Sequence, residues 1–244
     1  MTKRLIDIAT ADGPCRAGLF VPDGGSRTAI ILFMDIFGPR PALDAMAGRL
    51  VAIGHAVLVP DLFHRFGDRP AFDPKTAFSE EATKERLFGM LRGTTQAMTV
   101  ADTGAFLDAL SAQGFSGPVG VTGYCMGGAR ALNAAAAFPD RVAAAASFHG
   151  GNLATEADDS PHRRAAGMKA RIYVAAAGTD GSFPPEQAGR LAEALRAAEV
   201  DHVIETYAGT KHGWCMPDHP VYDPAGAERH WRRLETLFSE TLAA

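Results

Sequence analysis

Cys125, Asp180 and His212 are the residues whose types could together activate a nucleophile. Cys125 stands in a G-x-C-x-G arrangement between an apolar, β-branched run and an Ala-rich segment, which predicts a strand, a tight turn and a helix. Glycines at 123 and 127 remove side chains where the backbone must bend sharply. A thiol on such a turn lies at the positive end of the helix, where the thiolate is favoured. The stretch therefore predicts a nucleophilic cysteine.

Asp180 and His212 each fall on a turn that directly follows a predicted strand. The carboxyl ends of parallel strands meet at one edge of a sheet, so these turns would lie together with Cys125. Histidine would accept the thiol proton, and aspartate would orient the imidazole and stabilise its charge. The ordinary alternatives are a turn aspartate, a loop histidine and a buried thiol in a glycine-rich turn. Asp61 and Asp218 are rival acids, but one follows an earlier strand and the other comes after the histidine.

The hydrophobic pattern predicts eight strands and at least five helices. The strands are expected at 5–9, 16–21, 28–34, 56–60, 119 into the cysteine turn, 141–148, 170–177 and 202–207. The helices are expected at 42–53, 98–110, 129–138, 184–199 and 224–242. The first two strands form a hairpin, and residues 65–93 form an excursion over the sheet edge that could wall or cover a site. Alternation of strands and helices predicts an α/β fold with a mostly parallel sheet flanked by helices.

Composition excludes several classes of function. The chain has 244 residues, 47% of them hydrophobic, which is enough for one α/β domain over residues 1–244. A net charge of −4 with scattered basic residues argues against nucleic-acid binding. No segment is long and apolar enough for a membrane span or a signal peptide, so a cytoplasmic location is expected. Three cysteines and eight dispersed histidines show no metal-ligand spacing.

Backbone N–H groups of Ile36 and Met126 are the expected donors of an oxyanion hole. Met126 follows the cysteine on the turn, and Ile36 follows the third strand. Asp35 would then lie close to the thiol, where a second negative charge disfavours the thiolate. Phe37 and Trp214 are expected to line an apolar pocket.

These motifs resemble the dienelactone hydrolase (carboxymethylenebutenolidase) family across essentially the whole chain. The matching stretches are D-I-F-G at Asp35, G-Y-C-M-G-G around Cys125, G-T-D at Asp180 and K-H-G at His212. The resemblance implies an α/β-hydrolase fold with an eight-stranded, mostly parallel sheet. It also implies a Cys-His-Asp triad that opens the ring of an enol-lactone, dienelactone, through an acyl-thioester and without any cofactor.

Two positions depart from the family pattern. Well-studied members have Glu where this chain has Asp35, and that carboxylate is thought to keep the resting thiol protonated until substrate binds. They also have an Arg four residues after the catalytic histidine, where this chain has Met216. A second family Arg corresponds only roughly to Arg86 or Lys84. The resemblance therefore implies a thiol-regulating role for Asp35 and a substrate-binding role for Arg86, but leaves an anionic substrate less certain.

The expected function is hydrolysis of a small activated ester or lactone by a monomer or small homo-oligomer. A thiolate is a good leaving group, so an activated enol ester suits Cys125 better than a simple alkyl ester. One alternative is a broad carboxylesterase or thioesterase on the same triad. Another is a non-catalytic protein with a hydrolase-like fold that binds a small ligand or senses redox state through Cys125.

Overall fold

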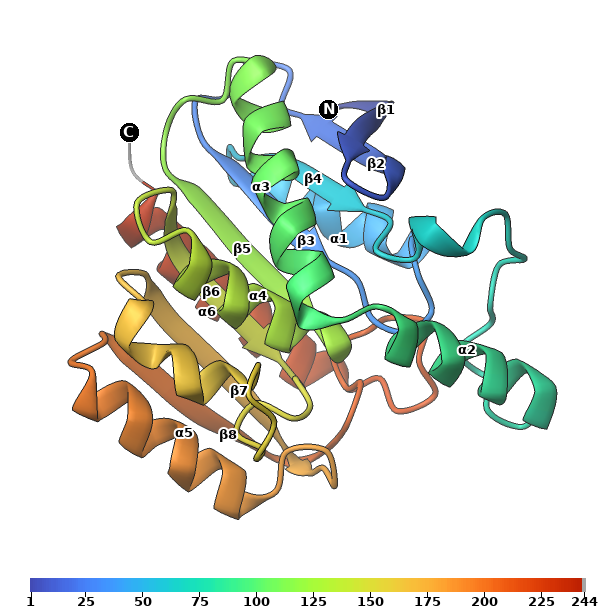
Figure 1. Cartoon of the computed structure of the whole chain (residues 1–244), viewed down its shortest axis with the longest axis vertical. Coiled ribbons are helices and arrows are strands. Elements are labelled where there is room, and N and C mark those ends of the chain that lie inside the picture. The colour runs from blue at the N-terminus through green and yellow to red at the C-terminus, as the bar shows by residue number, and fades with distance from the viewer. Residues whose placement is uncertain (243–244) are drawn as a thin grey trace.

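The computed structural model describes residues 1–242 and contains one eight-stranded sheet (Figure 1). The strands are β1 (Thr2–Thr10), β2 (Gly13–Val21), β3 (Ala29–Phe33), β4 (Ala56–Pro60), β5 (Val119–Tyr124), β6 (Val142–Phe148), β7 (Arg171–Thr179) and β8 (His202–Lys211). Their order in the sheet is β1-β2-β4-β3-β5-β6-β7-β8. β2 runs antiparallel to β1 and β4, and all other neighbours are parallel. The predicted initial hairpin and mostly parallel sheet are confirmed.

Six α-helices flank the sheet. They are α1 (Pro41–Ala52), α2 (Glu81–Gly93), α3 (Gln96–Ala112), α4 (Met126–Ala137), α5 (Pro185–Ala197) and α6 (Pro224–Thr241), with 3₁₀ turns η1 (His64–Phe66) and η2 (Pro161–Gly167). In Figure 1, α3, α4 and α5 lie in front of the sheet, while α1 and α6 lie behind it. The central strands β3, β4 and β5 are buried along their whole length, as expected for parallel strands covered on both faces. No helix within residues 1–242 is long and apolar enough to span a membrane.

Several predicted boundaries differ from the structure: β1 and β2 each begin three residues earlier than predicted, and three further differences have a local reason. α4 begins at Met126 instead of 129, because the glycine pair after the cysteine turn is already helical. η2 occupies the end of the predicted polar loop 152–167. β8 continues past Tyr207 through a bulge: Ala177 pairs with Tyr207 and Thr179 with Lys211, so three residues of β8 face one of β7. The bulge carries β8 up to the residue before His212.

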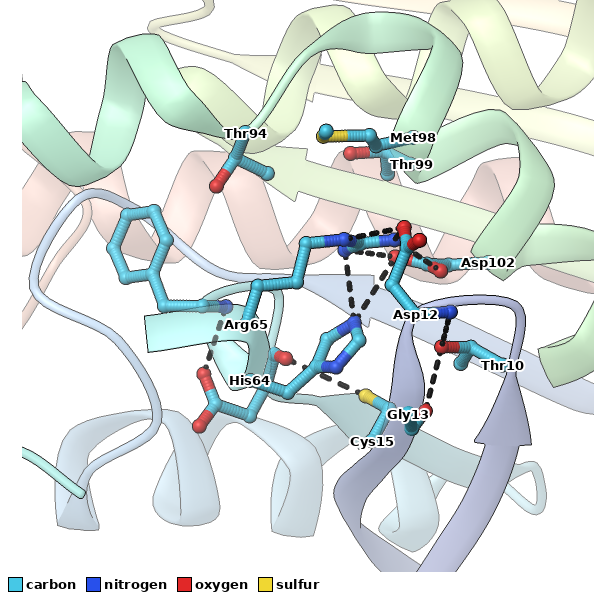
Figure 2. A network of polar contacts seen from close by, with 12 residues as sticks. Thr10, Asp12, Gly13, Cys15, His64, Arg65, Thr94, Met98, Thr99 and Asp102 are labelled. Carbon is cyan, nitrogen blue, oxygen red and sulfur yellow. Dashed lines mark hydrogen bonds and ion pairs between the residues drawn. The ribbon is translucent and has the colours of Figure 1, made fainter. Parts of the chain in front are cut away.

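A buried polar network holds the start of the excursion onto the sheet (Figure 2). Both terminal nitrogens of Arg65 donate to Asp102 of α3 at 2.8 Å, and its Nε donates to Asp12 of the hairpin. Arg65 Nη1 also donates to His64 Nε2 at 2.8 Å. The guanidinium therefore joins the β1–β2 hairpin, η1 and α3, and so anchors the segment that leads into α2.

His230 of α6 is a buried histidine in the core behind the sheet. Its Nδ1–H donates to the Ala227 carbonyl at 3.1 Å, and its Nε2 accepts from the Tyr124 hydroxyl at 2.9 Å. Burial lowers the pKa of His230 to about 3, because an imidazolium without solvent or a counter-ion is unfavourable. The ring is therefore neutral in the folded protein throughout the physiological range.

Acid should destabilise the protein through His230. The unfolded histidine binds a proton near its ordinary pKa, whereas the folded one does not until about pH 3. The stability that neutral His230 contributes is fully present above the pKa of the histidine in the unfolded chain. It is lost as the pH falls from that value toward the pKa of His230 in the folded protein. Between pH 7.5 and 5.0 we expect about 2 kcal/mol of the loss in unfolding free energy to come from this residue. Urea unfolding of wild type and His230→Gln at both pH values measures it.

The partly exposed His202 provides the matched control. His202→Gln should keep the wild-type difference between the two pH values, while His230→Gln should reduce it by about 2 kcal/mol. An unchanged pH dependence in His230→Gln would contradict the prediction, whatever the stability of that variant at pH 7.5.

Candidate active site

Cys125 occupies a strained turn between β5 and α4. Its φ of 54° and ψ of −117° lie outside the regions that residues with a side chain usually adopt. The turn is tight: a Cβ atom on Gly123 would lie 1.9 Å from the Gly127 carbonyl oxygen. Glycine is therefore required before the cysteine, and the sharp reversal leaves Cys125 at the end of the strand, partly exposed to the cavity described below.

The second glycine of the motif brings two backbone donors to the thiol. A Cβ on Gly127 would lie 2.5 Å from the Phe33 carbonyl oxygen, so α4 packs directly on the end of β3. Ile36 follows β3 and lies with Met126 in the wall of the same cavity. Met126 is the first residue of α4, whose N–H has no acceptor within the helix. The Ile36 N–H likewise has no backbone acceptor within residues 1–242. Both predicted donors thus belong to residues of the cavity that contains Cys125, and their role as an oxyanion hole stays a prediction.

The register of β7 and β8 places Asp180 against His212. Thr179 pairs with Lys211, so the next residue of each strand lies side by side, and His212 Nδ1 is 2.7 Å from Asp180 Oδ2. Ser182 donates its N–H and its hydroxyl to Asp180 Oδ1 at 2.9 and 2.6 Å. The carboxylate is thereby fixed in orientation. The Asp-x-Ser spacing is typical of an Asx turn, so the sequence could have indicated the contact between Asp180 and Ser182.

Charge in this cluster favours a protonated His212. Burial alone favours the neutral imidazole, but its interactions with Cys125 and Asp180, through charge and hydrogen bonding, outweigh it and raise the pKa of His212 to about 10. Burial also opposes ionisation of Asp180, yet the hydrogen bond from His212 holds the pKa of that carboxyl below its usual range. A proton on His212 is therefore stabilised from two sides, by Cys125 and by Asp180.

His149 contacts both Cys125 and His212, a role that the sequence analysis did not identify. Its Nδ1 accepts the Cys125 N–H at 3.1 Å, and its ring packs edge-on against His212 with centroids 4.8 Å apart. The residue is fully buried and has a φ of 39°. Burial holds the pKa of His149 well below its usual range, so the ring is neutral. His149 is followed by two glycines, of which Gly151 lines the cavity described next.

A cavity of about 690 Å³ opens at Cys125. It contains Phe37, as predicted, but neither Trp214 nor Arg86. Trp214 is fully buried and packs against His149 and Tyr207, while the Arg86 guanidinium lies over the Phe72 ring outside the cavity. The excursion forms one wall, as expected. The lining includes side chains that the sequence analysis did not identify: Phe78, Phe88, Leu91, Arg92, Gln96, Ala129, Arg130, Asn152, Ser182, His219, Pro220 and Val221.

Asp35 lines the cavity, but its carboxylate is already fully engaged. Arg40 donates to both oxygens at 2.6 and 2.8 Å, the Phe37 N–H donates to Oδ1, and His219 Nε2 lies 3.2 Å from Oδ2. Burial opposes its ionisation, yet His219 and Arg40 hold the pKa of Asp35 below its usual range. The role of Asp35 in controlling the thiol stays a prediction, and it would have to act from a carboxylate that Arg40 and His219 already hold. The same Arg40 also binds Asp218, one of the rival acids.

The remaining thiols and acids lie elsewhere. Cys15 is buried on β2, donates to the Asp61 carbonyl at 3.4 Å, and has its pKa raised to about 12 by burial and nearby carboxylates. Burial likewise raises the pKa of Cys215 well above its usual value. The Asp61 carboxylate pairs with Arg69. Within residues 1–242 no cluster of three His, Cys, Asp or Glu side chains is arranged to hold a metal ion.

A mostly parallel sheet that presents a nucleophile turn, an acid and a histidine at its carboxyl edge defines an α/β-hydrolase. The sequence model of the dienelactone hydrolase family matches residues 15–242. A carboxymethylenebutenolidase from Rhodococcus opacus is 30% identical over 227 residues, which cover 90% of this chain and 84% of that protein. The chain therefore belongs to the dienelactone hydrolase family, a family of hydrolases.

Solved structures agree with this assignment. A dienelactone hydrolase-like promiscuous phosphotriesterase from metagenomic libraries superposes with a TM-score of 0.80 at 26% identity, over 99% of both chains. A dienelactone hydrolase from Anabaena variabilis superposes with a TM-score of 0.72 at 16% identity, again over 99% of both chains. The second likeness concerns the fold alone.

Proposed function

We propose that this protein hydrolyses a small activated ester or enol-lactone through Cys125, His212 and Asp180, with an acyl-thioester intermediate. The observation that carries the proposal is the 2.7 Å contact between His212 Nδ1 and Asp180 Oδ2 in the wall of the cavity that Cys125 also lines. The family membership of the chain supports hydrolysis of a lactone or ester bond.

In the acylation step, the Cys125 thiolate attacks the carbonyl carbon of the substrate and forms a C–S bond. The carbonyl electron pair moves to oxygen, and the oxyanion accepts hydrogen bonds from the Ile36 and Met126 N–H groups. When the C=O bond re-forms, the C–O bond of the ester breaks, and the leaving oxygen takes the proton from His212 Nε2. Asp180 keeps Nδ1–H in place, so that Nε2 carries the mobile proton.

In the deacylation step, His212 is neutral and can accept a proton from water. The resulting hydroxide attacks the thioester carbon, the oxyanion again occupies the two backbone donors, and the C–S bond breaks. The thiolate is regenerated beside a protonated His212. The product is a carboxylic acid with the enol or alcohol it was joined to, and for a lactone both remain in one molecule.

A thiolate nucleophile restricts which esters can be hydrolysed. The tetrahedral intermediate can expel either the Cys125 thiolate or the alkoxide of the ester. Thiolate is expelled more easily than a simple alkoxide, so simple alkyl esters return to starting material. An enolate or phenolate leaving group competes better with the thiolate. We therefore expect activity on enol-lactones and aryl esters and little activity on ethyl or methyl esters.

Trapping of the acyl-enzyme tests the proposal. Wild type is mixed with dienelactone or p-nitrophenyl acetate, quenched in acid during turnover, and analysed by intact mass and peptide mapping. We expect one acyl group on Cys125 that neutral hydroxylamine removes, as for a thioester. Since a similar structure is described as a promiscuous phosphotriesterase, a p-nitrophenyl phosphotriester belongs in the same panel.

The competing functions give different results. Acylation by p-nitrophenyl acetate without turnover of dienelactone would favour a broad esterase on the same three residues. Turnover with no adduct on Cys125, and with full activity after its alkylation, would contradict the proposed mechanism. Absence of any turnover across the panel, with ligand binding retained, would favour the non-catalytic alternative.

A further inference from the structure

Arg130 of α4 is a buried arginine whose guanidinium is only partly paired. Its side chain is 6% exposed, and Nη2 donates to the Thr94 carbonyl at the junction of α2 and α3. Nε and Nη1 have no hydrogen-bond partner within residues 1–242. Arg130 also forms no ion pair with a carboxylate of the described residues; burial outweighs the opposing charge of Asp159 and lowers the pKa of Arg130 to about 10. The group is still cationic at neutral pH.

Two other arginines with little solvent exposure, Arg40 and the partly buried Arg65, are fully compensated. Arg40 lies between the Asp35 and Asp218 carboxylates, and Arg65 lies between Asp12 and Asp102 (Figure 2). An unpaired buried cation is unfavourable by several kcal/mol, and unmade hydrogen bonds add to this. Arg130 therefore lacks the anion that the comparable side chains have.

The position of Arg130 indicates where that anion comes from. Arg130 lines the same cavity as Cys125 and is five residues further along the same helix. Arg92 and Gln96 line the same part of the wall, and the Gln96 side-chain oxygen is also buried without a partner. The acidic residues of the cavity are already neutralised, since Asp35 pairs with Arg40 and Asp180 with His212. The cavity thus has an uncompensated positive charge on its α2–α3–α4 side.

That side is not where the leaving group departs. The leaving oxygen must reach His212, which projects with Asp180 and Ser182 from the loops after β7 and β8. In Figure 1 the loop after β7 and the end of β8 lie on the α5 side of α4, whereas α2 and α3 lie on the other side; the later part of the loop after β8 continues toward α2. A charged group near Arg130 would therefore belong to the acyl part of the substrate, not to its leaving group.

We propose that Arg130, assisted by Arg92 and Gln96, binds a carboxylate on the acyl portion of the substrate. The preferred substrates would then be activated half-esters, or the corresponding lactones, of short dicarboxylic acids. Planar guanidinium and carboxylate groups match in shape and charge, and Phe78, Phe88 and Leu91 would cover the connecting methylenes. Because Nε and Nη1 are covered by protein in this structure, binding requires a rotation of the guanidinium, which breaks only the bond to the Thr94 carbonyl.

This inference rests on the proposed hydrolysis through Cys125, and one substrate pair separates the two. Mono-p-nitrophenyl glutarate carries the acyl-side carboxylate, and p-nitrophenyl valerate is a neutral ester of the same chain length. For wild type we expect a higher kcat/KM with the glutarate ester. In Arg130→Gln the ratio of the two kcat/KM values should fall by about 10- to 100-fold, through KM more than through kcat, and Arg130→Lys should restore part of it.

Arg86→Gln is the matched control. It also removes one positive charge, but from a residue of α2 that lies outside the cavity, so the ratio of the two kcat/KM values should stay unchanged. The acetyl ester of 4-hydroxybenzoate, with its carboxylate on the leaving group, should not respond to Arg130→Gln. An equal loss on both p-nitrophenyl esters, or no preference for the glutarate ester in wild type, would overturn the inference while leaving the hydrolase intact. If neither ester were cleaved in a Cys125-dependent way, the proposed function itself would fail.

Inhibition of wild type provides a measurement that does not depend on the folding of a variant. Glutarate should compete with p-nitrophenyl valerate at concentrations at least about tenfold below those at which glutaramide does, because only the dianion can pair with Arg130. Equal inhibition by the two compounds would count against a carboxylate site.

Discussion

Replacing Cys125 by alanine is expected to lower kcat/KM for an activated ester by roughly 10³- to 10⁶-fold. Cys125 is the only cysteine of the described residues that lines the cavity, whereas Cys15 and Cys215 are buried and have raised pKa values. The cavity and the two backbone donors would remain, so substrate binding should persist. Stopped-flow or continuous absorbance assays of p-nitrophenolate release, together with a binding measurement on the inactive variant, check both statements.

Cys15→Ser is the control. Serine replaces the S–H donor to the Asp61 carbonyl by an O–H donor, and Cys15 lies outside the cavity, so the rate should stay at the wild-type level. His212→Ala should reduce the rate nearly as much as Cys125→Ala, and the double variant should be little slower than either, because the two residues act as a unit. Losses that add in the double variant would show that the two residues act independently, and the mechanism would need revision.

Replacing Gly123 by alanine is expected to destabilise the fold by about 4 kcal/mol or more and to remove activity. The added methyl group would lie 1.9 Å from the Gly127 carbonyl oxygen and 2.2 Å from its carbon, so it meets backbone that cannot rotate away. Relief requires the start of α4 to move off β5, which displaces the thiol and the Met126 N–H together. Thermal and urea unfolding, with the esterase rate of the folded fraction, measure the effect.

Gly89 offers a matched glycine-to-alanine control. It lies in α2, and a Cβ there would meet nothing within 4 Å. Gly89→Ala should therefore stabilise the protein by about 0.5 to 1 kcal/mol through helix propensity. A Gly123→Ala protein as stable and active as Gly89→Ala would show that the turn can relax, contrary to the geometry described.

The elements that carry the triad could be predicted because they depend on local pattern. Cys125, Asp180 and His212 each follow a strand whose apolar run is clear in the sequence, and parallel strands place their carboxyl ends together. The β8 bulge could not be predicted in this way. It inserts residues between two paired positions of neighbouring strands, and Gly209 alone does not specify where the pairing resumes.

The cavity wall was harder to predict for a different reason. Arg86 and Arg92 lie on the same helix, but only Arg92 lines the cavity, because the orientation of α2 is set by packing of the excursion and not by its own sequence. Arg130 looked like an ordinary residue of an Ala-rich helix. The state of Asp35 depended on Arg40 and on Asp218, which is 183 residues further along the chain.

The Arg40 bridge makes two loops a single unit for protein engineering. The loop that offers the Ile36 N–H and the loop that follows His212 are joined through one guanidinium and two carboxylates. Replacing Arg40 alone leaves the fully buried Asp35 carboxylate without its arginine, a change that typically destabilises a protein by about 3 to 5 kcal/mol, whereas replacing Asp35 or Asp218 alone leaves Arg40 with the other carboxylate. Libraries that vary Arg40 by itself would therefore recover mostly unstable variants, whereas joint randomisation of all three positions can reach neutral combinations and reshape both sides of the cavity at once.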